Sequence, residues 1–366
     1  MSLIARTGPQ EYECRVGVLA TLTNKLTLRG IQKAVIVHGA RSWEKAESYL
    51  ADLIASDLAL EFVAFNGECT YEEVDRIAER ARQSGADAII GVGGGKLMDT
   101  VKYAAAKSAA GVQSILIPTL ASNCAPWTPL SVMYNVEGVC LGFDLHTKQA
   151  ALLAVEPNLL LDAPVNYFIA GAADTLAKWY ESDIILSQPK HQTNALLLVS
   201  RAAALTCRDT ILNYAPQAVT DSQSHTLTQA FTQVCETIIA VSGLVGGLGD
   251  GYARSTIAHA VHDKLTIFPE THAFLHGEKV AYGILIQLSV EENWAEVDQL
   301  AAFYDKLNLP KTLADLNLSY LTDDQIAELA TNISVDANLS QSEYTATKET
   351  IQQAIHALEN YLTLKV

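Results

Sequence analysis

The sequence predicts an α/β N-terminal domain built on a parallel sheet, followed by an all-α C-terminal domain. Its 366 residues are enough for about two domain cores of ordinary size. The first 160 residues alternate short apolar runs with helical patterns, which is typical of a parallel sheet covered by helices on both faces. After about residue 166, long helical patterns dominate. We therefore expect one domain over residues 1–160 and a second over residues 161–366.

The strands expected in the N-terminal domain are short runs rich in apolar and β-branched residues. They occupy residues 33–38, 60–66, 87–92 and 113–118, and helical spacing lies between them at 42–56 and 71–85. A hairpin pattern follows, in which residues 131–135 and 139–143 flank a turn at 136–138. Two further apolar runs, 151–155 and 159–162, complete this layer.

Helices account for most of the C-terminal domain. The patterns cover residues 169–187, 191–212 and 224–242, and a glycine cluster follows at 243–249. From Trp294 onward the pattern is again helical, interrupted at Pro310 and at polar turns. We place the boundary between the domains near residues 157–166 and expect a ligand cleft between them, because such clefts are common binding sites.

Composition and charge exclude several classes of protein. The formal net charge is −16, which argues against a nucleic-acid binder and against docking on an anionic membrane. No uninterrupted apolar run approaches the ~20 residues of a membrane span. The first fifteen residues lack the pattern of a secretory signal. The six cysteines are scattered, with no Cys-x-x-Cys pair, so we expect reduced thiols and a cytoplasmic location.

A glycine loop at residues 93–96 is the first candidate for chemistry. Gly93, Gly94 and Gly95 follow an apolar strand and precede a helix, and Lys96 comes next. Without a Cβ, the backbone N–H groups can approach a phosphate closely, and the start of a helix supplies free donors. The loop matches neither the Gly-x-Gly-x-x-Gly fingerprint nor a P-loop. A plain tight turn is the alternative, but three consecutive glycines favour phosphate binding.

The segment after the strand at 33–38 bears on the choice between NAD and NADP. In a dinucleotide-binding sheet, an acid at this point accepts hydrogen bonds from the ribose 2′-hydroxyl of NAD, whereas an arginine favours a 2′-phosphate. Here Gly39, Arg41 and Ser42 follow the strand and no carboxylate is present. We therefore favour NADP(H) over NAD(H). The alternative is that Arg41 is only a solvated residue at the start of a helix.

One aspartate and a group of histidines suggest a metal site. Asp174 lies early in an apolar helical pattern, and a buried carboxylate must be paired or bind a cation. Four of the nine histidines lie between His259 and His276, and His259 and His262 share a helix face. One aspartate with two histidines suits catalytic zinc or iron. The alternative is that the histidines are hydrogen-bonded core or capping residues and that Asp174 interacts with a helix dipole.

These motifs together resemble a known family, the iron-containing (group III) alcohol dehydrogenases, and its glycerol dehydrogenase-like members in particular. The resemblance extends from about residue 10 to residue 310 and rests on segments that occur in the family's order: 93–96 with Asp99, 118–119, 130–132, 171–174, 259–262 and 276–279. It implies a dehydroquinate synthase-like fold. In that fold a Rossmann-like domain, here 1–160, binds the dinucleotide, and a helical domain, here 161–366, binds metal and substrate.

The resemblance also implies roles for individual residues. The metal ligands fall on Asp174, His259 and His276, and the position of a fourth ligand found in many members is Lys178, so a three-ligand site is expected. The pyrophosphate would lie against Gly93, Gly94, Gly95 and Lys96. His262 falls where a second histidine faces the substrate, as a proton shuttle near neutral pH. The other residues expected to bind the cofactor are Asp99, Thr119, Ser122, Thr128, Leu130 and Tyr134.

One departure from the glycerol dehydrogenase pattern concerns the substrate. Those enzymes have an aspartate that contacts the polyol, and Cys124 takes its position here. Loss of that charge removes repulsion against an anionic substrate. The string from Cys124 to Asn135 looks like the hydroxycarboxylate dehydrogenase branch, in which Lys178 could pair with a substrate carboxylate. The alternatives are that Cys124 and Trp127 only pack and that Lys178 pairs with Glu181.

The resemblance therefore implies a metal-dependent, NAD(P)H-linked oxidoreductase that interconverts a small 2-oxo acid and a 2-hydroxy acid. The residues expected near the substrate are His262, Lys178 and Cys124. Dehydrogenation of glycerol or another alcohol is one alternative, and a dehydroquinate synthase-type lyase or a non-catalytic nucleotide-binding relative is another. We expect a small-molecule substrate, no nucleic-acid or membrane partner, and a homo-oligomer.

Overall fold

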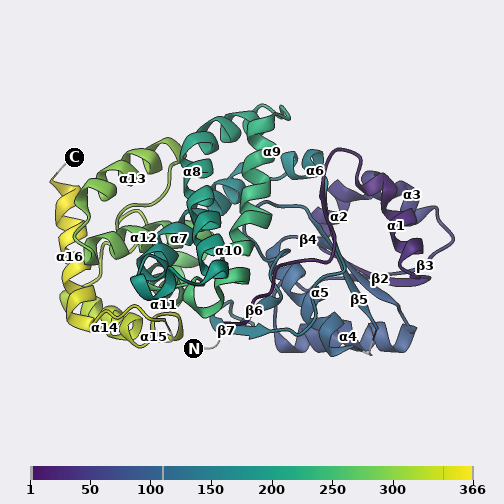
Figure 1. Cartoon of the computed structure of the whole chain (residues 1–366), viewed down its shortest axis with the longest axis horizontal. Coiled ribbons are helices and arrows are strands. Elements are labelled where there is room, and N and C mark those ends of the chain that lie inside the picture. The colour runs from purple at the N-terminus through teal and green to yellow at the C-terminus, as the bar shows by residue number, and fades with distance from the viewer. Residues whose placement is uncertain (1–2, 109–110, 341, 365–366) are drawn as a thin grey trace. The chain divides into compact units, whose positions relative to one another are not determined.

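A computed structural model describes residues 3–108, 111–340 and 342–364, and these divide into two compact units (Figure 1). The first, the sheet unit, comprises residues 6–168 and 221–243. The second, the helical unit, comprises the described residues of 1–5, 169–220 and 244–366. The division is therefore not a single cut at residue 160, because the chain returns to the sheet unit for 23 residues (221–243). The assignment of cofactor and substrate to separate domains, with a cleft between them, stays a prediction.

A six-stranded parallel sheet forms the centre of the sheet unit and confirms the expected α/β class. The strand order is β1-β8-β5-β4-β2-β3. The bounds are β1 Tyr12–Cys14, β2 Lys33–His38, β3 Ala59–Ala64, β4 Ala88–Gly93, β5 Gln113–Pro118 and β8 Leu152–Val155. Strands β2 and β5 coincide with the expected runs, and β3 and β4 are displaced by one or two residues. Strand β1 was not expected, because three residues are too few to establish a pattern.

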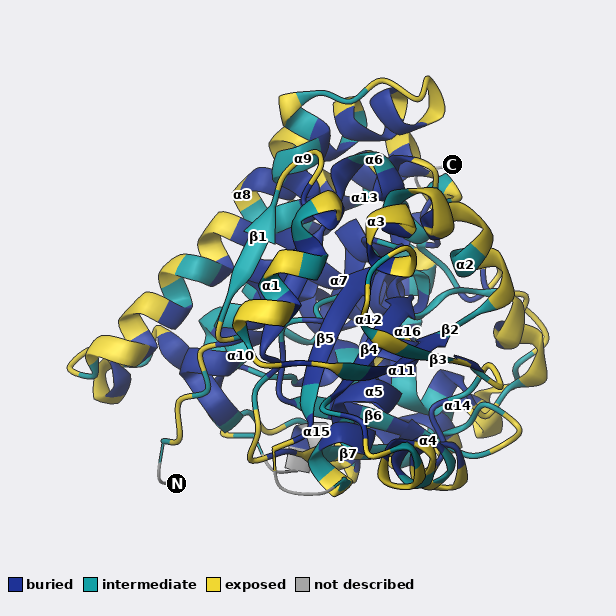
Figure 2. Cartoon of the chain, turned by 90° about the vertical axis from the view of Figure 1, so that its right-hand side faces the viewer, coloured by how far each residue is buried: buried dark blue, intermediate teal, exposed yellow. Residues whose placement is uncertain are grey.

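Helices cover both faces of this sheet. On one face, Ile36, Ile90 and Ile117 share a core with Leu22 and Leu53. On the other, Gly91 lies against α5, because alternate residues of a strand point to opposite faces. Figure 2 shows the inner strands β4 and β5 buried and the outer helix faces exposed. The helices in this part of the chain are α1 Leu22–Leu28, α2 Ala40–Ala46, α3 Ala51–Ile54, α4 Tyr71–Ser84, α5 Gly95–Lys107, α6 Pro157–Leu161 and α9 Gln229–Glu236.

Two expectations in this unit were wrong in detail. The single helix expected over 42–56 is divided into α2, a 3₁₀ turn at Glu47–Leu50, and α3. The apolar run at 159–162 belongs to α6 rather than to the sheet, because Pro157 begins a helix that the Glu156 side chain caps. The hairpin is confirmed: β6 Leu130–Tyr134 and β7 Cys140–Leu145 pair in antiparallel fashion as a separate two-stranded sheet.

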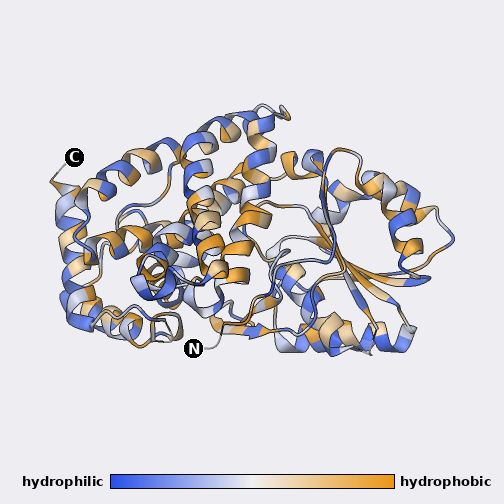
Figure 3. Cartoon of the chain, in the orientation of Figure 1, coloured by the Kyte–Doolittle hydropathy of each residue, from blue (hydrophilic) through white to orange (hydrophobic). Residues whose placement is uncertain are grey.

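The helical unit confirms the largely helical C-terminal part, and apolar residues lie on the inner sides of its helices (Figure 3). In the returning segment of the sheet unit, the helix expected at 224–242 begins only at residue 229, because Thr228 caps it and His225 has a φ of 47°. The glycine cluster at 243–249 lies within a helix. The helices here are α7 Val165–Leu186, α8 Ala195–Gln223, α10 Ser242–Gly249, α11 Ile257–Leu265, α12 His276–Val290, α13 Trp294–Leu307, α14 Asp323–Ser334, α15 Ala337–Ser340 and α16 Lys348–Thr363.

One helical stretch in the described residues is long and apolar enough to cross a membrane. It runs from Gln229 to Tyr252, and its most apolar window has a mean hydropathy of 1.4. Of that window, 67% is buried inside the protein, as in the core helix of a water-soluble protein. The stretch also carries Glu236 and Asp250, so it is weak evidence for a membrane span.

Candidate active site

The helical unit brings together Asp174, His259 and His276, the three residues expected to be metal ligands. One nitrogen or oxygen atom from each lies within 4.8 Å of the others. Asp174 Oδ1 is 3.3 Å from His259 Nε2 and 3.2 Å from His276 Nε2. Two imidazoles and a carboxylate converging in this way form a donor set suited to a divalent transition metal.

Helix α7 supplies three charged groups to this cluster. Asp174, Lys178 and Glu181 are spaced at i, i+4 and i+7, so they lie on one face of the helix, and all three are buried. Burial would raise the pKa of Asp174, but the charge of Lys178 and the adjacent side chains of His259 and His276 hold it well below its usual range. The carboxylate is therefore ionised, which is the form that binds a cation.

Two glycines let α12 approach its neighbours at backbone contact. A Cβ on Gly277 would lie 1.8 Å from the carbonyl oxygen of Ala170 in α7, and a Cβ on Gly283 would lie 2.4 Å from the carbonyl oxygen of Ala258 in α11. His276 is the first residue of α12, and His259 is next to Ala258. The close packing therefore places His276 beside ligand candidates on two other helices.

Glu181 is a residue of the site that the sequence interpretation did not select. Its Oε2 is 2.5 Å from His259 Nδ1, and its Oε1 accepts the backbone N–H groups of Thr256 at 2.7 Å and His259 at 3.0 Å. Burial alone would lower the pKa of His259, but the charge of Glu181 raises it to about 9. The spacing of two helical turns after Asp174 was the signal that could have identified it.

His262 lies beside this cluster with both ring nitrogens engaged. Its Nδ1 is 2.8 Å from Asp263 Oδ1, and its Nε2 is 3.0 Å from His276 Nδ1. Burial, with the charge of His276, lowers the pKa of His262 to about 3, far from the near-neutral value expected of a shuttle. The shuttle role stays a prediction.

The other two residues expected near the substrate belong to different units. Lys178 is buried one turn after Asp174, and its charge lowers the pKa of both Asp174 and Glu181. Cys124 lies in the sheet unit, between β5 and β6, where its carbonyl accepts the N–H groups of Trp127 and Thr128. The roles of Lys178 and Cys124 toward a substrate stay predictions.

The glycine loop joins β4 to α5 as expected, and packing explains each glycine. A Cβ on Gly93 would lie 2.7 Å from Leu97, one on Gly94 2.8 Å from Leu120, and one on Gly95 2.5 Å from Asn123. Gly94 is the N-cap of α5 and makes no side-chain cap, and the first turn holds no acid. The start of α5 therefore offers uncapped N–H donors that suit an anion.

The expected cofactor residues follow three adjacent strands. In the order β5-β4-β2, Gly93 pairs with Pro118 and Val92 pairs with His38, so the three carboxyl ends lie at one edge of the sheet. Ligands of open α/β sheets bind at that edge. The residues that follow these strands are Gly39 and Arg41 after β2, Gly94, Gly95 and Lys96 after β4, and Thr119 and Ser122 after β5.

Lys96 and Arg41, the two cations expected to bind phosphate groups, differ in their ion pairs. Lys96 Nζ is 2.5 Å from Glu68 Oε2 and 4.7 Å from the centre of the Tyr134 ring, so Glu68 already pairs with the charge expected to meet a pyrophosphate. Arg41 is exposed in α2, and among the described residues it forms no ion pair.

Asp99, in the first half of α5, binds the hairpin. Its Oδ2 accepts the N–H of Val132 at 3.0 Å, and its Oδ1 is 2.8 Å from Lys102 Nζ. The buried Lys102 ammonium also donates to three carbonyl oxygens, those of Ala125, Thr128 and Leu130, at 2.6, 2.7 and 2.5 Å. The Asp99–Lys102 pair thus fixes the segment that carries Thr128 and Leu130. The sequence interpretation missed Lys102, although an Asp–Lys pair three residues apart in an apolar helix was a signal.

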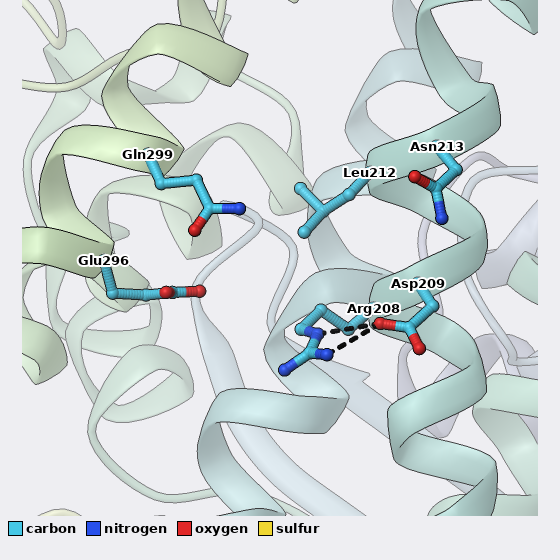
Figure 4. A pocket seen from close by; sticks show the side chains of 6 residues that line it. All are labelled: Arg208, Asp209, Leu212, Asn213, Glu296 and Gln299. Carbon is cyan, nitrogen blue, oxygen red and sulfur yellow. Dashed lines mark hydrogen bonds and ion pairs between the residues drawn. The ribbon is translucent and has the colours of Figure 1, made fainter.

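A pocket of about 270 Å³ in the helical unit lies apart from all of these residues (Figure 4). It lies between α8 and α13, where Arg208 pairs with Asp209. Its lining residues are Arg208, Asp209, Leu212, Asn213, Glu296 and Gln299. None of them is an expected site residue.

Comparison with known proteins gives matches over the whole length. A family model described as iron-containing alcohol dehydrogenase matches residues 9–157. Hydroxycarboxylate dehydrogenase A of Escherichia coli (strain K12) is 37% identical over 358 residues, which is 97% of each chain. Glycerol dehydrogenase of Pseudomonas putida is 37% identical over 275 residues, 73% of this chain and 72% of that protein. The structure of a probable glycerol dehydrogenase from Sinorhizobium meliloti 1021 has a TM-score of 0.86, 28% identity and 98% coverage of both chains.

Proposed function

Because the chain belongs to the iron-containing alcohol dehydrogenase family, whose members are NAD(P)-dependent enzymes acting on CH–OH groups, we propose that it interconverts a small 2-oxo acid and its 2-hydroxy acid. The observation that carries this choice is the likeness to a hydroxycarboxylate dehydrogenase over 97% of both chains. Cys124 in place of an acid, and the buried cation of Lys178, support an anionic substrate.

Membership of the family implies a metal and a nicotinamide dinucleotide, and the residues present suit both. We assign Asp174, His259 and His276 as ligands of one zinc or iron ion, because their donor atoms converge while Nδ1 of each imidazole is engaged elsewhere. A divalent ion there supplies Lewis-acid polarisation of the substrate carbonyl. Lys178 would bind the substrate carboxylate and orient the carbonyl carbon.

The dinucleotide would bind at the carboxyl edge of the sheet and supply the hydride. The start of α5, with Gly93, Gly94, Gly95 and Lys96, would hold its pyrophosphate. NADPH is favoured over NADH because Arg41 and Gly39, and no acid, follow β2. The other residues assigned to this site are Thr119, Ser122, Thr128, Leu130 and Tyr134.

We also propose a cytoplasmic homo-oligomer. The six cysteines are thiols rather than disulfides, in keeping with a reducing compartment. Leu198, Val199 and Leu205 of α8 are exposed by 41, 53 and 37%, and this apolar face is suited to burial against another copy. Size measurement of wild type and Val199→Glu tests the oligomer, which the substitution should dissociate.

The test of the proposed function is a substrate panel after metal analysis of the purified protein. Oxidation of NADPH and of NADH is followed with 2-oxo acids, aldehydes and dihydroxyacetone. We expect turnover with 2-oxo acids, faster with NADPH, and its loss after exhaustive chelation. Turnover with dihydroxyacetone alone would instead support a polyol dehydrogenase, the alternative favoured by the glycerol dehydrogenase structure with a TM-score of 0.86. Full activity after chelation would refute the metal role.

A further inference from the structure

We propose that a carboxylate holds each histidine of the metal cluster in its ligand-ready tautomer, the one whose lone pair is available to the metal. Glu181 does so directly for His259, and Asp263 does so through His262 for His276. The two carboxylates are then positioning residues. The inference rests on the proposed role of Asp174, His259 and His276 as metal ligands. It adds three side chains, Glu181, His262 and Asp263, to the account of that site.

A neutral imidazole has one N–H and one lone pair, and a metal can bind only the lone pair. Both Nε2 atoms face the same oxygen of Asp174, at 3.3 Å for His259 and 3.2 Å for His276. The ligand-ready tautomer therefore has its proton on Nδ1. A hydrogen-bond acceptor beside Nδ1 selects this tautomer and fixes the ring orientation.

Glu181 is the acceptor for His259. Its Oε2 lies 2.5 Å from Nδ1, and the backbone N–H groups of Thr256 and His259 hold its Oε1. The carboxylate is 2% exposed and is attached to the helix that carries Asp174. It therefore cannot turn away from the ring without leaving two buried N–H groups unpaired.

For His276 the acceptor is another imidazole, which must itself be oriented. An ionised carboxylate only accepts, so Asp263 fixes the proton of His262 on Nδ1, 2.8 Å away. The Nε2 of His262 is then a bare acceptor, and it lies 3.0 Å from His276 Nδ1. His276 must donate from Nδ1, which leaves its Nε2 lone pair facing Asp174. A hydrogen-bond donor at position 263 would allow His262 to carry its proton on Nε2. His276 would then accept at Nδ1 and carry its own proton on Nε2, the nitrogen that faces Asp174.

The test measures zinc affinity of the full-length protein by competition with a chromogenic chelator, with thermal melting as the check on folding. Asp263→Ala removes the acceptor and should weaken zinc binding by about 10- to 100-fold. Asp263→Glu keeps a carboxylate that can only accept and should remain within about threefold of wild type. Glu181→Leu and Glu181→Asp should differ in the same direction. Asp183→Asn is the matched control, since Asp183 lies on the same helix but pairs with Arg201.

The outcomes separate this inference from the proposed function. Wild-type protein that binds no zinc would overturn both. If wild type binds zinc and Asp263→Ala binds it with unchanged affinity, the role of Asp263 and His262 in orienting His276 would be overturned, but the proposed function would not. Equal losses in Asp263→Ala and Asp263→Glu would also overturn it, because an accepting carboxylate at this position would then not be decisive. If Asp263→Ala does not fold, His262→Phe and His262→Gln make the same comparison at the intermediate ring. The proposal requires His262→Gln, which has an oxygen that can accept from His276, to bind zinc more tightly than His262→Phe.

Discussion

A Cβ atom on Gly277 would lie 1.8 Å from the carbonyl oxygen of Ala170. Gly277 directly follows His276 at the start of α12, and Ala170 lies one turn before Asp174 in α7. The absence of a side chain at residue 277 therefore sets how closely two proposed metal ligands approach.

Gly277→Ala should separate these ligands. The obstructing atoms are backbone, so no side-chain rotation relieves the overlap, and α12 must shift. We expect the free energy of unfolding to fall by about 2 kcal/mol or more and zinc affinity to fall at least about tenfold. Denaturant unfolding and chelator competition measure the two effects. Gly246→Ala is the control, because the nearest atom to its Cβ is 3.5 Å away. Equal behaviour of the two variants would contradict the packing argument.

Asp174→Asn should abolish turnover while leaving the fold intact. The amide removes the negative charge of the donor set but keeps its shape, so the chain should lose its bound metal without losing helical structure. Metal content, circular dichroism and turnover report these three properties separately. Retention of one metal ion per chain with normal turnover would exclude Asp174 as a ligand.

Arg41→Ala should weaken binding of NADPH more than that of NADH. Loss of one charge-assisted contact to a 2′-phosphate would raise the KM for NADPH about tenfold, and NADH has no such group. Lys45→Ala, on the same helix, is the control for the general loss of positive charge. Equal changes in both KM values would remove Arg41 from the account of specificity.

Lys102→Met should destabilise the sheet unit. The buried ammonium holds three carbonyl oxygens and the Asp99 carboxylate, and its removal leaves these acceptors unpaired. We expect the free energy of unfolding to fall by about 3 kcal/mol. Lys107 lies on the same helix as Lys102 and forms a more exposed ion pair with Asp75 of α4. Lys107→Met removes this pair and should lower the free energy of unfolding by less than about 1 kcal/mol. Similar losses in urea unfolding would show that burial of Lys102 is not decisive.

Glu291→Gln should stabilise the protein at neutral and alkaline pH but not near pH 4.5. Burial, with the charge of Asp183, raises the pKa of Glu291 from 4.5 to about 7. Because the folded-state pKa exceeds the unfolded value, wild type loses stability as the pH rises from about 4.5 to about 7, and the glutamine variant escapes this loss. Melting temperatures should differ at pH 8 and converge near pH 4.5. Glu292→Gln, at an exposed neighbour, is the control, and a gap independent of pH would contradict the argument.

Local sequence patterns were sufficient for much of the sheet unit. The apolar runs of β2 and β5 coincide with the strands, and the glycine loop joins β4 to α5. In each case the signal lies within a few residues, because strand alternation, helix periodicity and glycine turns act over short distances along the chain. The three proposed metal ligands were likewise indicated by residue type, spacing and resemblance.

Only the tertiary structure decided what surrounds those ligands. Asp174 and His276 are 102 residues apart, and their meeting depends on backbone contact at Gly277. The role of Glu181 beside His259, and that of His262 between Asp263 and His276, depends on which ring nitrogen faces which neighbour. Hydrogen bonding is directional and acts over about 3 Å. Residue order therefore specified which groups were available, and helix packing determined their partners.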